Sequence, residues 1–137
     1  MAAFPSAVLA AAVLAAEEVS FLLVGSAALW LRGELAAVAD ADVVIEPGED
    51  NIDRLREALG GIAIGPVPSV DSLSCRSVVP VVTAYGKVDC LLERGRRDWV
   101  QLRRGAGFLP VADVPVLVAA SADAWSLRHR YKGREIE

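Results

Sequence analysis

Seven residues near the start of the chain, Val19 to Gly25 (VSFLLVG), form a short apolar run that ends at a glycine. Apolar runs of this length, bounded by a turn signal, are typical of a strand buried on both faces. A helix is predicted on either side of this run. The first is the alanine- and leucine-rich segment that Ser6 is predicted to cap and that runs to Glu18; the second is AALWLRG, which ends near Gly33. A strand covered on both faces needs helices packed against its sheet, so we predict a mixed α+β protein.

The rest of the sequence continues this alternation of helix and strand patterns. Further strands are predicted over Asp40 to Ile45 (DADVVI) and in a hairpin, Arg76 to Ala84 followed by Lys87 to Glu93. Pro80 lies within the hairpin and favours an edge strand or a bulge, because proline cannot donate a ladder hydrogen bond. The remaining predictions are a helix from Asn51 or Asp53 to Gly60-Gly61, a loop from Gly65 to Ser74, a helix from Trp99 to Arg104, a strand or turn from Val114 to Val118, and a last helix capped by Ser121. The order α-β-α-β-α-β-β-α predicts a mixed central sheet flanked by helices.

Length and composition favour one globular unit. The 137 residues predict a single domain, 1–137, and an apolar fraction of 54% allows a sizeable core. The uncharged stretch Ala7 to Ala16 is shorter than the roughly 20 residues that span a bilayer, and it lacks the basic start of a secretory signal. We therefore expect a cytoplasmic protein without a membrane segment. Cys75 and Cys90 form no C-x-x-C pair, and we expect both to be reduced core residues.

Charge is unevenly divided along the chain, although the net charge is only −4. Residues 1–70 carry ten acidic and three basic side chains, whereas residues 71–137 carry eight acidic and eleven basic ones. If both halves share one fold, this division predicts an acidic site facing a basic rim that could meet phosphates. The basic run Arg94, Arg96, Arg97, Arg103 and Arg104 allows two interpretations, a solvated face or a contact with nucleic acid.

Two carboxylates lie two residues apart where the second predicted strand begins. Because alternate residues of a strand point to the same side, Asp40 and Asp42 present their carboxylates together, while Ala41, Val43 and Ile45 point to the other face. Like charges this close repel each other unless a cation neutralises them. Magnesium prefers hard oxygen ligands and can bridge carboxylates to triphosphate oxygens. The pair therefore predicts a Mg²⁺ (or Mn²⁺) site, with solvated carboxylates at a strand entry as the alternative.

Two further features are predicted to complete this site. Gly25-Ser26 stands where a buried strand meets a helix; backbone amides at a helix start favour anions, and glycine lets a phosphate approach closely. Ser26 can add a hydroxyl hydrogen bond or serve only as an N-cap. Asp89 lies within an apolar strand, where a carboxylate is costly unless it binds a metal or an arginine. If that strand lies beside Asp40 and Asp42, three carboxylates meet at one edge, a set suited to two-metal nucleotidyl transfer.

With these residues the sequence resembles the nucleotidyltransferase superfamily, whose hallmark is Gly-Ser or Gly-Gly, then Asp-x-Asp, then an aspartate on a later strand. The stretch LLVGSAALWLRGELAAVADADVVI carries the first part of the resemblance, and AYGKVDCLLE carries the last. The layout is similar in particular to the abortive-infection type nucleotidyltransferase toxins, which have a late helix with a basic residue followed by Gly-Arg. Here that segment is SLRHRYKGREIE, which makes Arg128, Arg130 and Lys132 candidates for a triphosphate contact. The resemblance implies a fold like that of DNA polymerase β.

The resemblance also implies an activity: magnesium-dependent transfer of a nucleoside monophosphate from a nucleoside triphosphate to an acceptor hydroxyl. Asp40 and Asp42 would bind both metals, Asp89 would serve the acceptor side, and Gly25 with Ser26 would hold the triphosphate. Similarity to the toxin group further implies RNA, in particular transfer RNA, as the acceptor and an antitoxin protein as a partner. A protein hydroxyl is the other acceptor class.

Two departures from the toxin pattern motivate a hypothesis of a different class. Ala36 to Ala39 reads Ala-Ala-Val-Ala where the toxins often carry an arginine and a threonine, and the family usually continues into further helices beyond the point where this sequence ends. A nucleotidyltransferase-like fold without catalysis, acting as a binding or interaction module, is therefore the second hypothesis. A metal-dependent phosphohydrolase is the third, although such sites commonly use several histidines and this sequence has only His129.

Overall fold

The computed structural model describes residues 3–92 and 95–127. Its centre is a six-stranded sheet with the strand order β3-β4-β2-β1-β6-β5. The strands are β1 (Phe21–Val24), β2 (Ala41–Ile45), β3 (Val78–Thr83), β4 (Gly86–Leu91), β5 (Gly107–Val111) and β6 (Val114–Val118). The helices are α1 (Ser6–Ala16), α2 (Gly25–Leu31), α3 (Glu49–Gly60), α4 (Val70–Cys75) and α5 (Gly95–Gly105), and residues 121–127 are also helical.

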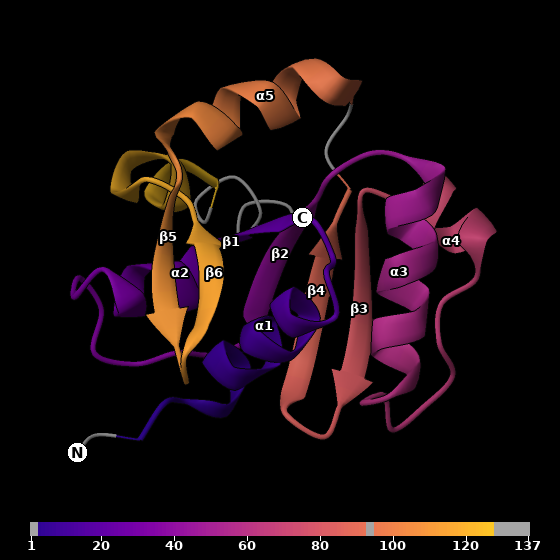
Figure 1. Ribbon diagram of the computed structural model, residues 1–137, viewed down its shortest axis with the longest axis horizontal. Helices are drawn as coiled ribbons and strands as arrows, with labels where there is room; N and C mark the ends of the chain where they lie inside the picture. The colour runs from indigo at the N-terminus through magenta and orange to yellow at the C-terminus, as the bar shows by residue number, and fades with distance from the viewer. Residues whose placement is uncertain (1–2, 93–94, 128–137) are drawn as a thin grey trace, which may run out of the picture.

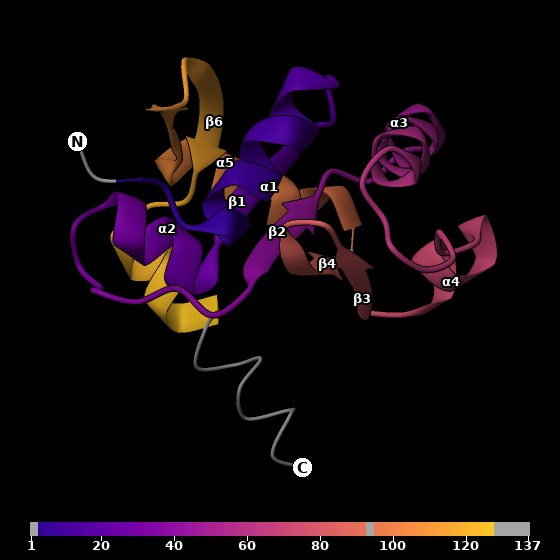
Figure 2. The same ribbon diagram turned by 90° about the horizontal axis from the view of Figure 1, so that it is seen from below.

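Helices cover both faces of the sheet. α1 crosses the face nearer the viewer in Figure 1, where it packs on β6, β4 and β2 and also contacts α3. α2 packs on β1 and β2 from the opposite face, and the view from below separates it from α1 (Figure 2). The predicted class, an α+β protein with a mixed central sheet flanked by helices, is confirmed. None of the helices in the described part of the chain combines the length and apolar character needed to cross a membrane.

The middle of the sheet is buried on both faces. β1 runs antiparallel to β2 and parallel to β6, and β2 runs parallel to β4. All four residues of β1 are buried, which agrees with the prediction from the VSFLLVG run. Sheet strands that carry helices on both sides read as continuous apolar runs rather than alternating ones, so this burial follows from the layered architecture. The polar residues of β2 and β4 therefore lie in a setting where each one needs a partner.

The predicted hairpin is confirmed as β3 and β4, joined at Tyr85. Among the described strands β3 lies at the end of the sheet next to β4, with an isolated bridge from Thr83 to Ala63 on its other side, so Pro80 lies on an edge strand as expected. Proline is tolerated there because an edge strand leaves one side of its backbone outside the ladder. The strand over Val114–Val118 and the helix that contains Trp99 are also present, as β6 and α5.

Four local predictions were wrong or incomplete. Pro5, not Ser6, is the N-cap of α1, and α3 begins earlier than predicted, at Glu49. The loop predicted between Gly65 and Ser74 contains the start of α4, whose N-cap Ser69 accepts a hydrogen bond from the backbone amide of Ser72. β5 was missed because its turn to β6 uses Ala112 and Asp113 at positive φ angles of 48° and 68°. Hairpin turns of this kind usually carry Asn-Gly or Asp-Gly, so Ala112-Asp113 was not recognisable as a hairpin turn.

Candidate functional site

The site is built around the junction of β1 and α2. Gly25 is the first residue of α2 and has a φ of +67°, a left-handed conformation that glycine adopts without steric cost. A Cβ placed at this position would lie 3.1 Å from Cγ of Asp42 and would collide with one of its carboxylate oxygens. Glycine at this point therefore has a specific reason: the backbone passes directly against the side chain of Asp42.

The strand register brings two of the predicted carboxylates side by side. Asp42 on β2 is the Cα partner of Val24 on β1 and of Asp89 on β4. Cα partners on neighbouring strands point to the same face of a sheet, so the two aspartates share one face across the parallel β2–β4 pair. Asp89 is almost fully buried, with a side-chain exposure of 8%. The sequence placed these residues 47 positions apart, and the predicted convergence of their strands is present.

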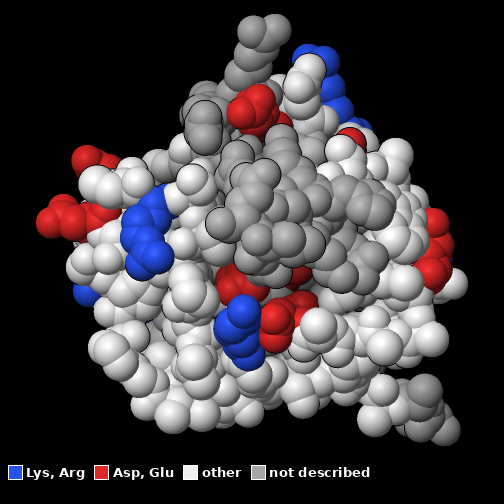
Figure 3. All heavy atoms as spheres, turned by 180° about the vertical axis from the view of Figure 1, so that it is seen from behind, with Lys and Arg blue, Asp and Glu red and all other residues white. Residues whose placement is uncertain are grey.

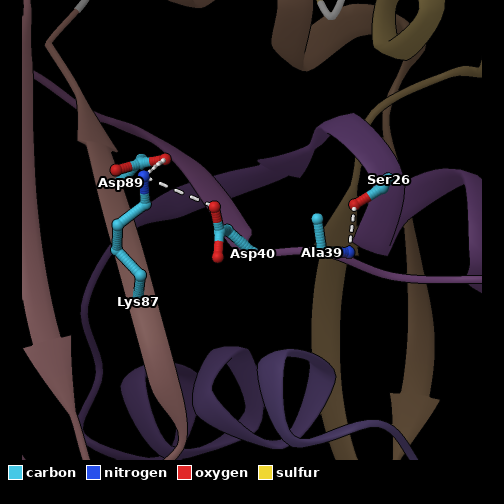
Figure 4. Close-up of polar contacts among 5 residues, drawn as sticks. All are labelled: Ser26, Ala39, Asp40, Lys87 and Asp89. Carbon is cyan, nitrogen blue, oxygen red and sulfur yellow. Dashed lines mark hydrogen bonds and ion pairs between the residues drawn. The ribbon is translucent and has the colours of Figure 1, made fainter.

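Asp40 joins the group through a lysine. It lies one residue before β2, and its Oδ2 is 3.4 Å from Nζ of Lys87. The same Nζ is 3.7 Å from Oδ2 of Asp89. Figure 4 shows the lysine side chain extending along β4 so that its ammonium lies between the two carboxylates. Lys87 was not among the predicted site residues, although its position two residues before Asp89 on the same strand places both side chains on one face.

Ser26 holds the segment that leads into the site. Its Oγ accepts a hydrogen bond from the backbone amide of Ala39 at 3.2 Å (Figure 4), and the residue is buried. The bond ties α2 to the residue just before Asp40 and so restrains where that carboxylate can go. Because the hydroxyl acts as acceptor here, its own proton remains able to donate to another group. A structural role for Ser26 is thus present, and it is compatible with the predicted contact to a phosphate.

The buried thiol of Cys90 lies next to Asp89 in an apolar part of the sheet. Burial, and then the negative charge of Asp89, raise the pKa of Cys90 from 9.0 to about 12. The thiol is therefore neutral and behaves as an apolar group. Both cysteines are free, as expected, but Cys75 is exposed at the end of α4 rather than buried in the core.

The donor set can be tested for its fit to a divalent cation. Carboxylate oxygens are the ligands that magnesium prefers, and two of the three carboxylates already converge on one positive charge, the ammonium of Lys87. Among the described residues, no group of three or more His, Cys, Asp or Glu side chains is arranged as a complete metal site. The residue types are those that a hard cation prefers, and the ammonium of Lys87 lies where two of these carboxylates meet.

Other predicted features lie apart from this cluster or outside the described residues. Arg128, Arg130 and Lys132, the predicted triphosphate contacts, fall beyond residue 127 and are not described. A cavity of about 660 Å³ lies at the carboxyl end of β2, lined by Ile45 and residues of α3 and α4, whereas Asp42 lies near the start of that strand.

The described side chains form no basic rim on the face turned away from the viewer in Figure 1. There, described acidic and basic side chains meet near the centre, and the other charges are scattered (Figure 3). On α5, the guanidinium of Arg103 lies over the ring of Phe108, 5.8 Å from its centroid. A basic surface for nucleic acid therefore stays a prediction.

Comparison with known proteins gives one informative likeness. Neither a protein-family model nor a curated protein matches the sequence. Among solved structures, the chain is similar to the crystal structure of a proposed nucleotidyltransferase from Thermotoga maritima, with a TM-score of 0.62 and 14% sequence identity over 89% of this chain and 82% of the other. At that identity the likeness concerns the fold. The chain therefore has a nucleotidyltransferase-like fold, as its Gly-Ser and Asp-x-Asp pattern predicted.

Proposed function

We propose that this protein is a metal-dependent nucleotidyltransferase that moves a nucleoside monophosphate from a nucleoside triphosphate to an acceptor hydroxyl. The observation that carries the proposal is the register in which Asp42 lies opposite Asp89 on one side and next to the β1–α2 junction on the other. This register puts two acidic side chains and a close-approach glycine at one place in the sheet. The likeness of the fold to the Thermotoga maritima protein supports the same class of activity.

Each side chain has a task in this reaction. The acceptor oxygen attacks the α-phosphorus, the bond from that phosphorus to the bridging oxygen of the β-phosphate breaks, and pyrophosphate leaves with the electron pair. Asp40 and Asp42 would hold Mg²⁺ (or Mn²⁺), which when bound neutralises triphosphate charge and acidifies the acceptor hydroxyl. Asp89 lies on the adjacent strand and would accept the hydroxyl proton. Positioning and charge neutralisation are the main contributions that a protein makes to such a transfer.

The triphosphate is proposed to lie against the start of α2. Gly25 lets the carboxylate of Asp42 lie directly against the backbone at this point, and the N-cap residue Val24 offers no side-chain hydrogen bond to the helix end. Ser26 retains a hydroxyl proton to donate. Arg128 and Lys132 are proposed to bind the same triphosphate, in keeping with the resemblance to the toxin group. The acceptor proposed on that resemblance is RNA, in particular transfer RNA, with a protein hydroxyl as the other class and an antitoxin as a partner.

The test is label transfer from each of the four nucleoside triphosphates in the presence of Mg²⁺, with total RNA and with protein as separate acceptors. A label on the α-phosphate is expected to appear in the acceptor, whereas a label on the γ-phosphate is expected only in pyrophosphate. Asp42→Asn keeps the shape of the side chain but removes a metal ligand, and we expect it to lower transfer by more than about 100-fold, the upper end of what loss of outer-shell support alone costs.

A matched control comes from an exposed carboxylate on α3. Asp53→Asn makes the same chemical change on the surface and is expected to leave transfer unchanged. Equal transfer by Asp42→Asn and the native protein would refute the assignment. Transfer of the γ-label in place of the α-label would point to a different phosphate chemistry, and hydrolysis without any acceptor would favour the phosphohydrolase hypothesis.

One observation favours the second candidate, a binding module without catalysis. The ammonium of Lys87 already offsets part of the charge of Asp40 and Asp89, so the folded site does not require a metal ion for that purpose. Calorimetry with ATP, CTP, GTP and UTP plus Mg²⁺ separates the two candidates. An absence of heat at millimolar nucleotide would favour the module, because an enzyme of the proposed class must bind its triphosphate.

A further inference from the structure

The side chain of Lys87 occupies the position where a cation would be expected in a carboxylate site. Its Nζ lies 3.4 Å from Oδ2 of Asp40, which precedes β2, and 3.7 Å from Oδ2 of Asp89, which lies on β4 (Figure 4). Asp42, the strand partner of Asp89, belongs to the same face. An ammonium and a divalent cation cannot both lie between the same two carboxylate oxygens, because their charges repel and the space is shared.

We propose that Lys87 is the resident counter-ion of this site and competes with the divalent cation for Asp40 and Asp89. This inference rests on the proposed function. In the free protein the ammonium keeps the carboxylates together, and binding of Mg²⁺ or Mn²⁺ requires it to leave. The metal affinity of the free protein is therefore set partly by Lys87 and is lower than that of the three carboxylates alone.

The exposure of the three side chains makes such an exchange feasible. The side chain of Lys87 is 42% exposed and that of Asp40 is 36% exposed, so both can change rotamer without opening the core. Asp89, in contrast, is 8% exposed and is fixed within β4. Lys87 and Asp40 are thus the exposed partners of this cluster, and Asp89 is the buried one. Ion pairs at half-exposed positions are weak, so a divalent ion can replace the ammonium at a modest cost.

The direct test measures Mn²⁺ affinity without nucleotide, by electron paramagnetic resonance titration of free Mn²⁺. The native protein is compared with Lys87→Met, which keeps the apolar stem and removes the charge, and with Lys87→Arg, which keeps the charge. Lys87→Met is expected to bind Mn²⁺ roughly 3- to 30-fold more tightly, since each of the two ion pairs contributes up to about a factor of five. Lys87→Arg is expected to stay near the native value. Arg54→Met removes one exposed positive charge from α3 and controls for the change in net charge.

The outcomes separate this inference from the proposed function. Tighter Mn²⁺ binding by Lys87→Met, with no change in Arg54→Met, supports the competition. Equal affinity in the native protein and Lys87→Met overturns it, while the metal site itself stands. Failure of every variant to bind millimolar Mn²⁺ overturns the metal site and the competition together. Weaker binding by Lys87→Met also overturns the competition, since it would mean that the lysine supports the bound ion.

A second measurement follows the lysine itself and does not depend on how well a variant folds. The chain has only two lysines, Lys87 and Lys132, so reductive methylation with ¹³C-formaldehyde, which retains the positive charge, labels two side chains and the amino terminus. Lys87→Arg identifies the signal of Lys87 by its disappearance. Addition of Mg²⁺ is expected to move the Lys87 signal toward that of a solvated dimethyl-lysine. A Lys87 signal that does not move while Mg²⁺ binds would overturn the proposal.

Discussion

The contact between Gly25 and Asp42 makes a quantitative prediction about stability. In Gly25→Ala the backbone of the alanine must keep a φ of +67°, and its Cβ would collide with the carboxylate of Asp42. A left-handed backbone at a non-glycine residue costs about 1–2 kcal/mol. Displacing a packed neighbour costs about 1–3 kcal/mol more. The free energy of unfolding should therefore fall by about 2–5 kcal/mol.

A second glycine supplies a matched control. Gly33 has a similar φ of +77°, but a Cβ built there meets nothing within 4 Å. Gly33→Ala should thus carry only the backbone cost, about 1–2 kcal/mol. Urea unfolding followed by circular dichroism compares the two variants, and a shift of the midpoint at constant slope reports stability rather than a change in the unfolded state. The difference between them isolates the collision with Asp42.

A double-mutant cycle tests the same contact from the other side. Asp42→Ala removes the carboxylate that the new Cβ of Gly25→Ala would strike, although Cβ of residue 42 remains 3.2 Å away. The double variant should then be less destabilised than the sum of the single variants, by about 1 kcal/mol or more, as is usual for residues in contact. If Gly25→Ala costs no more than Gly33→Ala and the cycle is additive, the close approach of backbone and carboxylate is not a property of the folded protein.

The remaining predictions concern a buried hydroxyl, a buried amide and the two thiols. Ser26→Ala removes the acceptor of a loop amide and should lower the free energy of unfolding by about 1–2 kcal/mol in urea melts. Asn51 makes three hydrogen bonds with backbone groups, so Asn51→Ala should cost about 3 kcal/mol, whereas exposed Asp53→Ala should change the same melts by less than about 0.5 kcal/mol. With Ellman's reagent at pH 8, Cys75 should react at once and Cys90 only after denaturation, because Cys75 is exposed and burial raises the pKa of Cys90 to about 12. The folded pKa of Cys90 lies above its unfolded value of 9.0, so the stability contributed by its protonated thiol is present below pH 9 and is lost as pH rises toward 12. Cys90→Ala should therefore flatten the plot of unfolding free energy against pH between pH 9 and 12. An unchanged plot would contradict the pKa shift.

The sequence was most informative at positions where burial explains the residue type. The apolar VSFLLVG run, the Asp-x-Asp pair and the aspartate within an apolar strand each predicted a position that the structure shows, because burial leaves few alternatives. That the strand of Asp89 lies beside the strand of Asp42 was only a condition of the predicted site, and the parallel direction of that pairing was not predicted. A lone carboxylate in an apolar strand indicated that some partner must exist, without identifying it.

What the sequence did not reveal depends on contacts between segments. The local signal for Lys87 is weak: it lies two residues before Asp89, but a lysine near a hairpin turn is ordinarily a solvated side chain. Asn51 was predicted only as a possible helix start, yet it is buried and binds the backbone of Ser20 and Glu46. In both cases the decisive partner lies on another element, and single-sequence patterns carry information mainly about neighbours along the chain. The β5–β6 hairpin was missed for a different reason, since its turn residues are atypical.

The packing of the core fixes the strand register that aligns the carboxylates of the candidate site. On β4 the side chains alternate, so Val88 and Cys90 face the opposite side from Lys87 and Asp89. A slip of one residue against β2 would place Asp89 on the other face and bring Val88 or Cys90 opposite Asp42. Such a slip would set an aspartate among side chains that are fully buried, at a cost of several kcal/mol. The apolar residues between the acidic ones therefore keep the carboxylates on one face, and mutations of Val88 or Cys90 should disturb the proposed metal binding through the register even though neither side chain faces the site.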